Sequence, residues 1–575
     1  MSGDAQTDGV TAGGALFGKL KALGVDYVFA NSGTDFPPII EGLIEARDQG
    51  IPLPEAVVVP HEHVAMGMAH GYTLLTGRAQ AVMLHTNVGL ANGSIGAINA
   101  ACDQIPVFMM SGRTPVAEQD RFGARTVPIG WGQEMYDQTA LVREACKWEY
   151  ELKFPDQVAP VLDRGWSIAN STPKGPVYLS LPREVLCEPC PPTGLDAPSA
   201  LAPVRAAPDR AALAQAAACL AKAERPLIIA QRGAGSDEAF RALAHFVEDH
   251  AIPLSHYWAN QIAIPMSSPC HVDWFPGELL KDADVVLVIN ALAPWWPDRA
   301  APSPDATVIQ LGPDPLFARS TPMRSFRSDL TLAGDTGPAL LELIEAVRAQ
   351  GVDRAHVDAR RARVTAASDA ARESARTQAA TGNGTPMSKE WVSHCLGQAI
   401  RGQRASVFHE LGCPLPALEL DTHLSYFQEP HAGGLGWGLP AAMGAQLADP
   451  DRLCFATVGD GSYMFANPTA CHQVCEALGL PVITLVLNNE EWGAVRHSVE
   501  GLYKNGLARK SNDVPLTSLR PSPDFTLTAQ ASRAHTETVT DGGALPAALD
   551  RAIHIARTER RQVLLNIAIE RAHRH

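Results

Sequence analysis

Short runs of apolar residues recur along the chain, and the segments between them repeat apolar positions every three or four residues. Runs of this length predict β-strands, and the longer spacing predicts amphipathic helices. In the first third, the predicted strands span residues 25–30, 56–60, 81–85, 107–111 and 177–181. A helix is predicted from Glu62 to about Leu75. Strands that alternate with helices in this way predict a parallel sheet covered on both faces.

The same alternation returns twice further along the chain. The predicted strands of the second block span 226–230, 285–290 and 307–311, and those of the third span 405–409, 454–458, 482–487 and 563–567. A Pro- and Ala-rich stretch at 189–208 predicts a linker, and a polar, Ala- and Arg-rich stretch at 339–381 predicts helix. The fold class expected is therefore α/β, with three doubly wound parallel-sheet domains. We place these domains at 1–190, 200–350 and 385–575, with a helical connector at 351–384.

Composition narrows the possible partners and the compartment. The chain has 575 residues, a formal net charge of −15 and 11 scattered cysteines. An acidic surface repels phosphate backbones and anionic lipid, which argues against nucleic acid and membrane partners. The start of the chain lacks the basic and apolar regions of a signal peptide, and no apolar run reaches the roughly 18 residues of a membrane span. These features predict a cytoplasmic protein with reduced thiols.

The strongest chemical signal lies where two strands of the third block end. The first strand is followed by Gly459-Asp460-Gly461-Ser462 and the second by Asn488-Asn489-Glu490-Glu491-Trp492. Both segments should lie at the carboxyl edge of one parallel sheet, where such folds bind ligands. Carboxylate, amide and carbonyl oxygens suit Mg²⁺, and the glycines let backbone amides approach phosphate oxygens.

This pair of segments resembles the G-D-G and N-N motif of the thiamine-diphosphate enzymes. The resemblance implies that Asp460, Asn489 and the main-chain oxygen of Glu491 bind Mg²⁺, although Asn488 remains an alternative to Asn489. It also implies that Gly459, Gly461 and Ser462 contribute to cofactor binding. Two unrelated turns after buried strands would give a similar pattern, but their coupling favours the cofactor site.

A second resemblance lies in the first block, at His61-Glu62-His63. In the family, a glutamate at this point contacts the aminopyrimidine ring of the cofactor, which implies a catalytic role for Glu62 in proton exchange. A helix-capping glutamate is the structural alternative. A zinc helix is excluded, because the histidines lack the spacing of H-E-x-x-H.

Two further segments resemble parts of the family's cofactor cradle. In the Gly-rich turn at 432–440, the main-chain oxygen of Gly433 would hold the cofactor's amino group, and Leu435 would support its bent shape. The segment around Gly412 and Cys413 resembles the one whose backbone binds the diphosphate. Because hydroxyl residues are missing there, only main-chain donors are expected.

The substrate site is expected among residues that match benzoylformate decarboxylases. His85 stands where those enzymes keep a catalytic histidine, and a histidine titrating near neutrality can donate a proton. A histidine merely hydrogen-bonded within its loop is the alternative. His271 corresponds to a second catalytic histidine, with a solvent-exposed loop residue as its alternative. Thr34 should touch the substrate, and Trp492 and His497 are candidates for lining its pocket, or for packing only.

The resemblance covers essentially the whole chain and is closest to the acetolactate synthase and benzoylformate decarboxylase branch. It implies thiamine diphosphate and Mg²⁺ as cofactors, and a homodimer or homotetramer with active sites at the subunit interface. The isolated Gly233-Ala234-Gly235 gives no adequate support for FAD, and we expect none. The activity implied is non-oxidative decarboxylation of a 2-oxo acid. The alternatives are a carboligase of acetolactate synthase type, a 2-hydroxy-ketone or 2-hydroxyacyl-CoA lyase, and a non-catalytic homologue.

Overall fold

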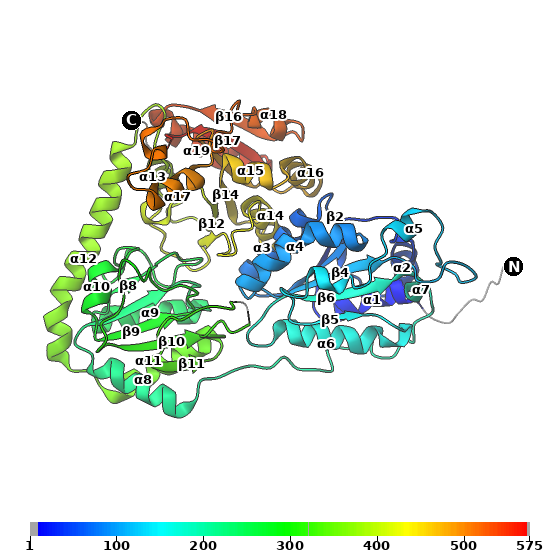
Figure 1. Cartoon of the computed structure of the whole chain (residues 1–575), viewed down its shortest axis with the longest axis horizontal. Helices are drawn as coiled ribbons and strands as arrows, with labels where there is room; N and C mark the ends of the chain where they lie inside the picture. The colour runs from blue at the N-terminus through cyan, green and yellow to red at the C-terminus, as the bar shows by residue number, and fades with distance from the viewer. Residues whose placement is uncertain (1–9, 320, 572–575) are drawn as a thin grey trace. The chain divides into compact units, whose positions relative to one another are not determined.

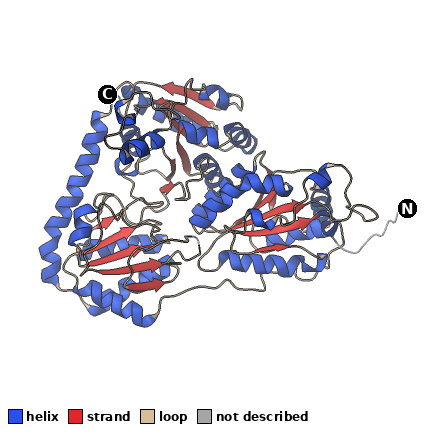
Figure 2. Cartoon of the chain, viewed as in Figure 1, coloured by secondary structure: helices blue, strands red, loops and turns tan. Residues whose placement is uncertain are grey.

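The computed structural model describes residues 10–319 and 321–571 and contains three parallel sheets, coloured red in Figure 2. The chain divides into two compact units. The first runs to Val204 and also takes in Pro430–Asp449, while the second holds Arg205–Glu429 and the chain from Pro450 onwards. Three parallel α/β sheets confirm the fold class expected from the sequence. Within the described residues, no helix is both long and apolar enough to cross a membrane.

The first unit contains a six-stranded sheet with the order β2-β1-β3-β4-β6-β5. Its strands are β1 (Tyr27–Ala30), β2 (Glu55–Val58), β3 (Gln80–Leu84), β4 (Val107–Arg113), β5 (Glu149–Glu151) and β6 (Val177–Pro182). Its helices are α1 (Ala12–Ala22), α2 (Pro37–Asp48), α3 (Glu62–Thr76), α4 (Thr86–Cys102), α5 (Ile129–Gly132), α6 (Val158–Asn170), α7 (Arg183–Leu186) and α14 (Gly438–Ala448). All of β3 is buried, as expected for a central strand with helices on both faces.

The second unit contains the other two sheets. The middle sheet, in the order β11-β10-β9-β7-β8, is formed by β7 (Pro226–Ala230), β8 (Leu254–Ser255), β9 (Val285–Ile289), β10 (Thr307–Gly312) and β11 (Leu330–Ala333). The third sheet, in the order β13-β12-β14-β15-β17-β16, is formed by β12 (Ala405–Glu410), β13 (Tyr426–Gln428), β14 (Leu453–Gly459), β15 (Ile483–Asn488), β16 (His535–Val539) and β17 (Val563–Ala568). Every strand predicted from the sequence is present, with ends that differ by at most two residues.

Helices flank both of these sheets (Figure 1). Those of the middle sheet are α8 (Arg210–Lys222), α9 (Asp237–His250), α10 (Gly277–Asp282) and α11 (Thr336–Gln350), and α12 (Arg354–Thr381) follows them. Those of the third sheet are α13 (Lys389–Ala399), α15 (Asp460–Phe465), α16 (Pro468–Leu478), α17 (Gly493–Leu502), α18 (Phe525–Gln530) and α19 (Leu545–Thr558). The stretch predicted to be helical at 339–381 therefore forms most of α11 and all of α12.

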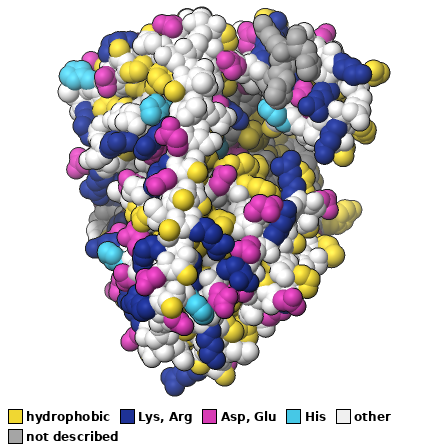
Figure 3. Space-filling model, turned by 90° about the vertical axis from the view of Figure 1, so that its left-hand side faces the viewer, with side chains coloured by type: hydrophobic (Ala, Val, Ile, Leu, Met, Phe, Trp, Pro, Cys, Tyr) yellow, Lys and Arg dark blue, Asp and Glu magenta, His cyan; other side chains and the backbone are white. Residues whose placement is uncertain are grey.

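The long helix α12 is fastened by arginine side chains that cap other helices. Arg360 is buried and donates to the main-chain oxygens of His250, at 2.6 and 3.0 Å, and of Ala223, at 2.7 Å. These oxygens lie at the carboxyl ends of α9 and α8, where helix carbonyls lack partners and favour a cation. In Figure 3, basic and acidic side chains are interspersed on the face that carries α12.

Helices α3 and α14 cross with their backbones in close contact (Figure 1). A Cβ atom added to Gly71 would lie 1.9 Å from the main-chain oxygen of Ala441, and one added to Gly444 would lie 1.9 Å from that of Met68. All of α3 from Glu62 to Thr73 is buried, as expected for a helix with apolar residues on every side. This contact explains why Pro430–Asp449 belongs to the first unit.

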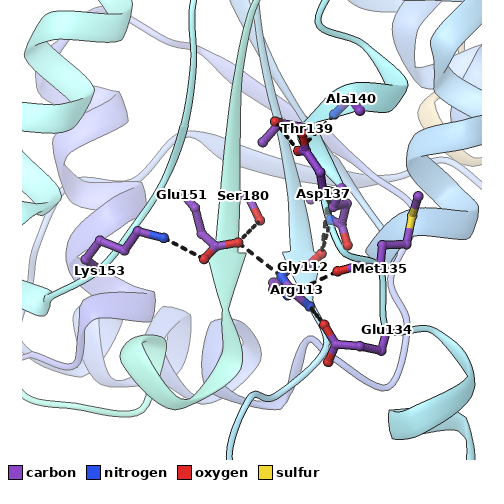
Figure 4. Close-up of polar contacts among 12 residues, drawn as sticks. Gly112, Arg113, Glu134, Met135, Asp137, Thr139, Ala140, Glu151, Lys153 and Ser180 are labelled. Carbon is purple, nitrogen blue, oxygen red and sulfur yellow. Dashed lines mark hydrogen bonds and ion pairs between the residues drawn. The ribbon is translucent and has the colours of Figure 1, made fainter.

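The loop between β4 and β5 contains little regular structure and is held by ion pairs (Figure 4). Arg113, at the end of β4, lies 2.6 Å from a carboxylate oxygen of Glu134 and 3.0 Å from one of Glu151. Glu134 also pairs with Arg125. The Arg113 side chain is only 12% exposed, so water screens these pairs less than it screens pairs on the surface.

We expect Gly71→Ala to loosen the crossing of α3 and α14. The added methyl group has no room against the Ala441 carbonyl, and overpacking of this kind costs ~1–3 kcal/mol. Amide hydrogen exchange of α3, followed by mass spectrometry, should accelerate. Gly501→Ala is the matched control, because a Cβ at this helical position of α17 meets nothing within 4 Å. Unchanged exchange in α3 would show that the backbones are not in close contact.

We expect Arg113→Gln to release the loop between β4 and β5. Loss of both partly buried ion pairs should cost ~1–2 kcal/mol, which corresponds to cleavage about 5- to 30-fold faster by chymotrypsin. The loop offers the exposed aromatic residues Phe122, Trp131 and Tyr136 as cleavage sites. Arg143→Gln is the control, because Arg143 pairs with Asp137 and Glu149 but is 46% exposed. Equal cleavage rates in the two variants would contradict a specific role for Arg113.

Candidate active site

The predicted site residues of the first unit follow the carboxyl ends of neighbouring parallel strands. Thr34 lies in the turn after β1, Glu62 begins α3 after β2, and His85 follows β3 directly. Because β1 pairs with both β2 and β3 in parallel, these three chain segments leave the sheet at the same edge. Thr34 is exposed, whereas Glu62 is buried and His85 is half-buried.

Glu62 lies in a water-poor setting, with 5% of its surface exposed. One carboxylate oxygen accepts a hydrogen bond from Asn31 Nδ2 at 2.9 Å, and the other accepts one from Asn92 Nδ2 at 3.1 Å. The cap of α3 is the His61 side chain, which accepts from the backbone N–H of His63 at 3.2 Å. The helix-capping alternative for Glu62 is therefore wrong, and two amide groups orient its carboxylate.

His85 is held by Asp35, an acid that no motif of the sequence indicates as a site residue. Its Nδ1 lies 2.5 Å from Asp35 Oδ1, and its Nε2 lies 3.1 Å from Gln133 Nε2. Asp35 is buried, and its other oxygen accepts from the backbone N–H of Thr86 at 3.3 Å. The hydrogen bond to Asp35 is the main reason why the pKa of His85 is raised above its usual value, against the opposing effect of burial. His85 thus joins three separate loops of the unit.

The Gly-rich turn precedes α14 and is tied to α3 and α4. Asn99 donates to the main-chain oxygen of Gly434 at 2.8 Å and accepts from its N–H at 3.2 Å. His63 Nε2 lies 3.1 Å from the main-chain oxygen of Leu435. Gly433 has a φ of 68°, a left-handed conformation that favours glycine. The turn that contains Gly433 and Leu435 therefore belongs to the same unit as Glu62 and His85.

Asp460 and Ser462 carry unsatisfied polar atoms at the start of α15, in the second unit. Asp460 is 4% exposed, and its Oδ1 accepts from the N–H of Gly461 at 2.9 Å. Asp460 Oδ2 and Ser462 Oγ are buried and have no hydrogen-bond partner among the described residues. Burial raises the pKa of Asp460 to about 6, because it disfavours the charged form. A cation beside Oδ2 would offset this cost.

The Asn-Asn segment begins at the last residue of β15, the neighbour of β14. Asn488 Nδ2 donates to Ser522 Oγ at 3.0 Å and to Asn566 Oδ1 at 3.3 Å, so its amide is engaged within the fold. Asn489 Oδ1 accepts only from the nearby N–H of Glu491, at 3.1 Å, among the bonds described. Asn488 Oδ1 likewise accepts from the N–H of Glu490 at 3.1 Å, so both asparagines remain candidates for the predicted ligand.

Glu491 and Trp492 fix the shape of this segment. The Glu491 carboxylate pairs with the buried Arg496 at 3.2 Å, which leaves the main-chain oxygen as the group suited to a ligand role. A Cβ on Gly461 would lie 2.2 Å from the Trp492 ring. Trp492 therefore packs directly on the Gly-Asp-Gly segment and brings the two predicted motifs together. His497 is exposed on α17, with Nδ1 2.8 Å from the main-chain oxygen of Gly493.

Gly412 and Cys413, two other predicted site residues, lie against Thr457 of β14. A Cβ on Gly412 would lie 2.3 Å from the Thr457 main-chain oxygen, so only glycine fits there. The N–H of Cys413 donates to Thr457 Oγ1 at 3.4 Å. Burial raises the pKa of the Cys413 thiol to about 12, so this side chain stays neutral.

His271 lies in the middle domain, with its ring 4.8 Å from that of His256. It is 8% exposed, so the alternative of a solvent-exposed loop residue is wrong. Burial lowers its pKa to about 4, which makes it a poor proton donor at neutral pH. The structure brings the His271 ring together with that of His256.

The residues present fit thiamine diphosphate and Mg²⁺. Among the described residues, no group of three or more His, Cys, Asp and Glu could hold a metal ion. The predicted set does not depend on such a group, because it combines one carboxylate, one amide and one carbonyl. The unsatisfied oxygens of Asp460 and Ser462, together with the close packing at Gly412 and Gly461, suit a cation and a diphosphate.

Comparisons with known proteins identify the domains of the chain. The family models described as the N-terminal TPP binding, central and C-terminal TPP binding domains of thiamine pyrophosphate enzymes match residues 10–141, 213–343 and 413–567. TPP stands for thiamine pyrophosphate, which is another name for thiamine diphosphate. These matches cover most of the chain.

Relatives and a solved structure extend over nearly the same length. The probable 2-ketoarginine decarboxylase AruI of Pseudomonas aeruginosa is 28% identical, over 91% of this chain and 88% of its own. Benzoylformate decarboxylase of the same organism is 27% identical, over 84% of this chain and 87% of its own. Acetolactate synthase of Mycobacterium bovis is 24% identical, over 91% of this chain and 82% of its own. The thiamine diphosphate-dependent 4-hydroxybenzoylformate decarboxylase of Rhodococcus jostii RHA1 shares the fold, with a TM-score of 0.76 at 22% identity, over 98% of this chain and 100% of its own.

The fold and the sequence matches thus agree on one assignment and confirm the resemblance seen in the sequence. The chain belongs to the thiamine pyrophosphate enzymes, in the branch that includes the benzoylformate decarboxylases and acetolactate synthases.

Proposed function

We propose that this enzyme decarboxylates a 2-oxo acid without oxidation, using thiamine diphosphate and Mg²⁺. The observation that carries the proposal is His85, a half-buried histidine whose pKa is raised by Asp35, at the same sheet edge as the buried Glu62. Non-oxidative decarboxylation ends with a proton replacing the lost carboxylate, so the site needs a proton donor.

The chain's own groups divide into those that would hold the cofactor and those that would move protons. Thiamine diphosphate, when bound, supplies a nucleophilic carbon and an electron sink for breaking a bond beside a carbonyl. The Mg²⁺ ligands would be Asp460, Asn489 and the Glu491 main-chain oxygen. The remaining holding groups would be Gly412, Cys413, Gly433, Leu435, Gly459, Gly461 and Ser462.

Glu62 would hydrogen-bond to the cofactor's aminopyrimidine ring and exchange a proton with it. Asn31 and Asn92 each donate to one oxygen of its carboxylate, which fixes the plane of that group. His85 would deliver a proton to the product, because its raised pKa keeps a larger fraction of the ring protonated near neutrality. Thr34, in the turn after β1, would touch the substrate, and Trp492 and His497 remain candidates for its pocket.

A carboligase of acetolactate synthase type is the second candidate. It is supported by the similarity to the acetolactate synthase of Mycobacterium bovis over 91% of the chain. In that reaction a second carbonyl compound takes the place of the proton, so the two activities differ in what His85 does. A lyase acting on a 2-hydroxy-ketone or a 2-hydroxyacyl thioester is the third candidate.

The proposal includes assembly into a homodimer or homotetramer with shared active sites. The family resemblance supports it by implying that Glu62 and the Asp460 metal site of one active site come from different chains. The separate placement of these residues, in the first and the second unit, is compatible with such sharing.

The reaction is tested with the protein loaded with thiamine diphosphate and Mg²⁺ and given pyruvate, benzoylformate or 5-guanidino-2-oxopentanoate. We expect CO₂ together with a free aldehyde, and a fall in kcat of ~10²–10⁴-fold in His85→Ala. His554→Ala, which changes an exposed histidine on α19, is the control. CO₂ with a 2-hydroxyketone product would identify a carboligase. Bound cofactor without CO₂ from any acid would exclude both.

Glu62→Gln should abolish turnover while the cofactor still binds. The amide cannot exchange a proton, so the rate at which the bound cofactor's C2 hydrogen exchanges in D₂O should fall ~10²-fold or more. Glu55→Gln, at an exposed position that begins β2, should leave this rate unchanged. A normal exchange rate in Glu62→Gln would remove Glu62 from the mechanism.

Mixing Glu62→Gln with Asp460→Ala tests whether each active site takes residues from two chains. If each site takes Glu62 from one chain and Asp460 from the other, reassembled mixtures of the two inactive variants should recover about a quarter of wild-type activity. No recovery, in mixtures shown by mass to contain both chains, would place the two residues of each site in one chain.

A further inference from the structure

Asp35 is a buried acid with both carboxylate oxygens directed to the start of α4. Oδ1 lies 2.5 Å from His85 Nδ1, and Oδ2 accepts from the N–H of Thr86 at 3.3 Å. The Asp35 side chain is 5% exposed. A buried carboxylate is costly unless a charge or several hydrogen bonds compensate it, and these two contacts supply that compensation.

Two glycines leave the room that this pair occupies. A Cβ on Gly112, in β4, would lie 1.6 Å from Asp35 Oδ2, and a Cβ on Gly33 would lie 2.0 Å from His85 Nδ1. No other residue fits at either position without displacing the acid or the ring. Gly112 beside Asp35 and Gly33 beside His85 therefore leave the space in which the acid and the ring can meet.

We propose that Asp35 is the positioning residue for proton transfer by His85, holding Nδ1–H so that Nε2 is the atom that exchanges the proton. This inference rests on the proposed role of His85 as proton donor. A hydrogen on Nδ1 is required by the carboxylate in either charge state of the ring. Nε2 is then left as the nitrogen that gains and loses a proton.

Gln133 is placed to accommodate both states of Nε2. Its side-chain amide lies 3.1 Å from that nitrogen. The amide offers NH₂ to a neutral ring and, after rotation by half a turn, its oxygen to a protonated one. The ion pair between Arg113 and the adjacent Glu134 anchors this part of the loop. The proton that leaves Nε2 is regained from water, since 21% of the His85 side chain is exposed.

The charges around His85 favour the protonated ring. Asp35, in the turn before α2, and Glu62, on α3, both raise its pKa, whereas burial lowers it, and Gln133 and Gly33 are neutral. Since the folded pKa is raised, the stabilising contribution of the pair is complete below the unfolded pKa of about 6.5 and is lost as pH rises through the folded value. An ion pair that serves only the fold would have the same titration but would leave catalysis unaffected.

The test measures the titration of His85 directly and compares it with catalysis. In the holoenzyme, diethyl pyrocarbonate modifies only neutral imidazole, and peptide mass spectrometry reports the modification rate of His85 at each pH. In Asp35→Asn the charge is lost while an acceptor oxygen remains. The pH midpoint of His85 modification should therefore be lower than in the wild type. The alkaline limb of the kcat profile should move by the same amount, with KM changed less than kcat.

Asp48→Asn is the matched control, because it removes an exposed acid at the end of α2, the helix that follows Asp35. This control should leave unchanged both the pH midpoint of His85 modification and that of the alkaline limb of the kcat profile. Unaltered modification of His85 in Asp35→Asn would overturn the pairing, and a shifted modification midpoint with an unaltered kcat profile would overturn the positioning role.

Two outcomes separate this inference from the proposed function. If no 2-oxo acid is turned over, the decarboxylase proposal fails, and the modification midpoints still decide whether Asp35 and His85 are paired. If Asp35→Asn does not fold, the wild-type midpoint decides, and a value at or below about 6.5, that of an ordinary histidine, would overturn the inference.

Discussion

The first unit depends on the close crossing of α3 and α14. The backbones approach so nearly at Gly71 and Gly444 that no side chain fits between them. This contact joins a segment from the last third of the sequence to the sheet formed by the first third. As a result, the turn with Gly433 is held against α3 and α4 by His63 and Asn99, in the same unit as Glu62. Dense packing of backbone against backbone thus creates the setting in which the polar groups act.

Three buried acids illustrate how the surroundings of a carboxylate decide its chemistry. Glu62 is held by two neutral amides, which orient it and add no charge. Asp35 faces an imidazole that can become a cation, so its charge is matched within the protein. Asp460 keeps one oxygen without a partner among the described residues, a state that burial makes costly and that a cation relieves. These surroundings fit the roles proposed for the three acids, which are proton exchange, positioning and metal binding, respectively.

The sequence predicts the central strands well and the edge strands poorly. The strands it misses, β5, β8, β11, β13 and β16, all lie at the edges of their sheets. Central strands are buried on both faces and appear as apolar runs, whereas edge strands such as β5 (EYE) and β16 (HTETV) mix polar residues or are very short. A related distinction explains which site residues the sequence predicts and which it misses. Gly-Asp-Gly and Asn-Asn follow strong central strands, but Asp35 and Gln133 meet His85 only through the fold, and no spacing along the chain reports that meeting.

The loop between β4 and β5 reaches His85 from a segment with little regular structure of its own. It carries Gln133 to Nε2 of His85, yet it is anchored mainly by ion pairs of Arg113 and Arg125 with Glu134. A shallow, open hollow lined by Thr126, Val127, Pro128 and Trp131 lies a few residues before Gln133. Because loops tolerate substitution better than strands do, this segment can change its apolar lining while the Asp35–His85 pair stays in place. The Asp35–His85 contact and the Gln133–His85 contact therefore depend on different parts of the chain.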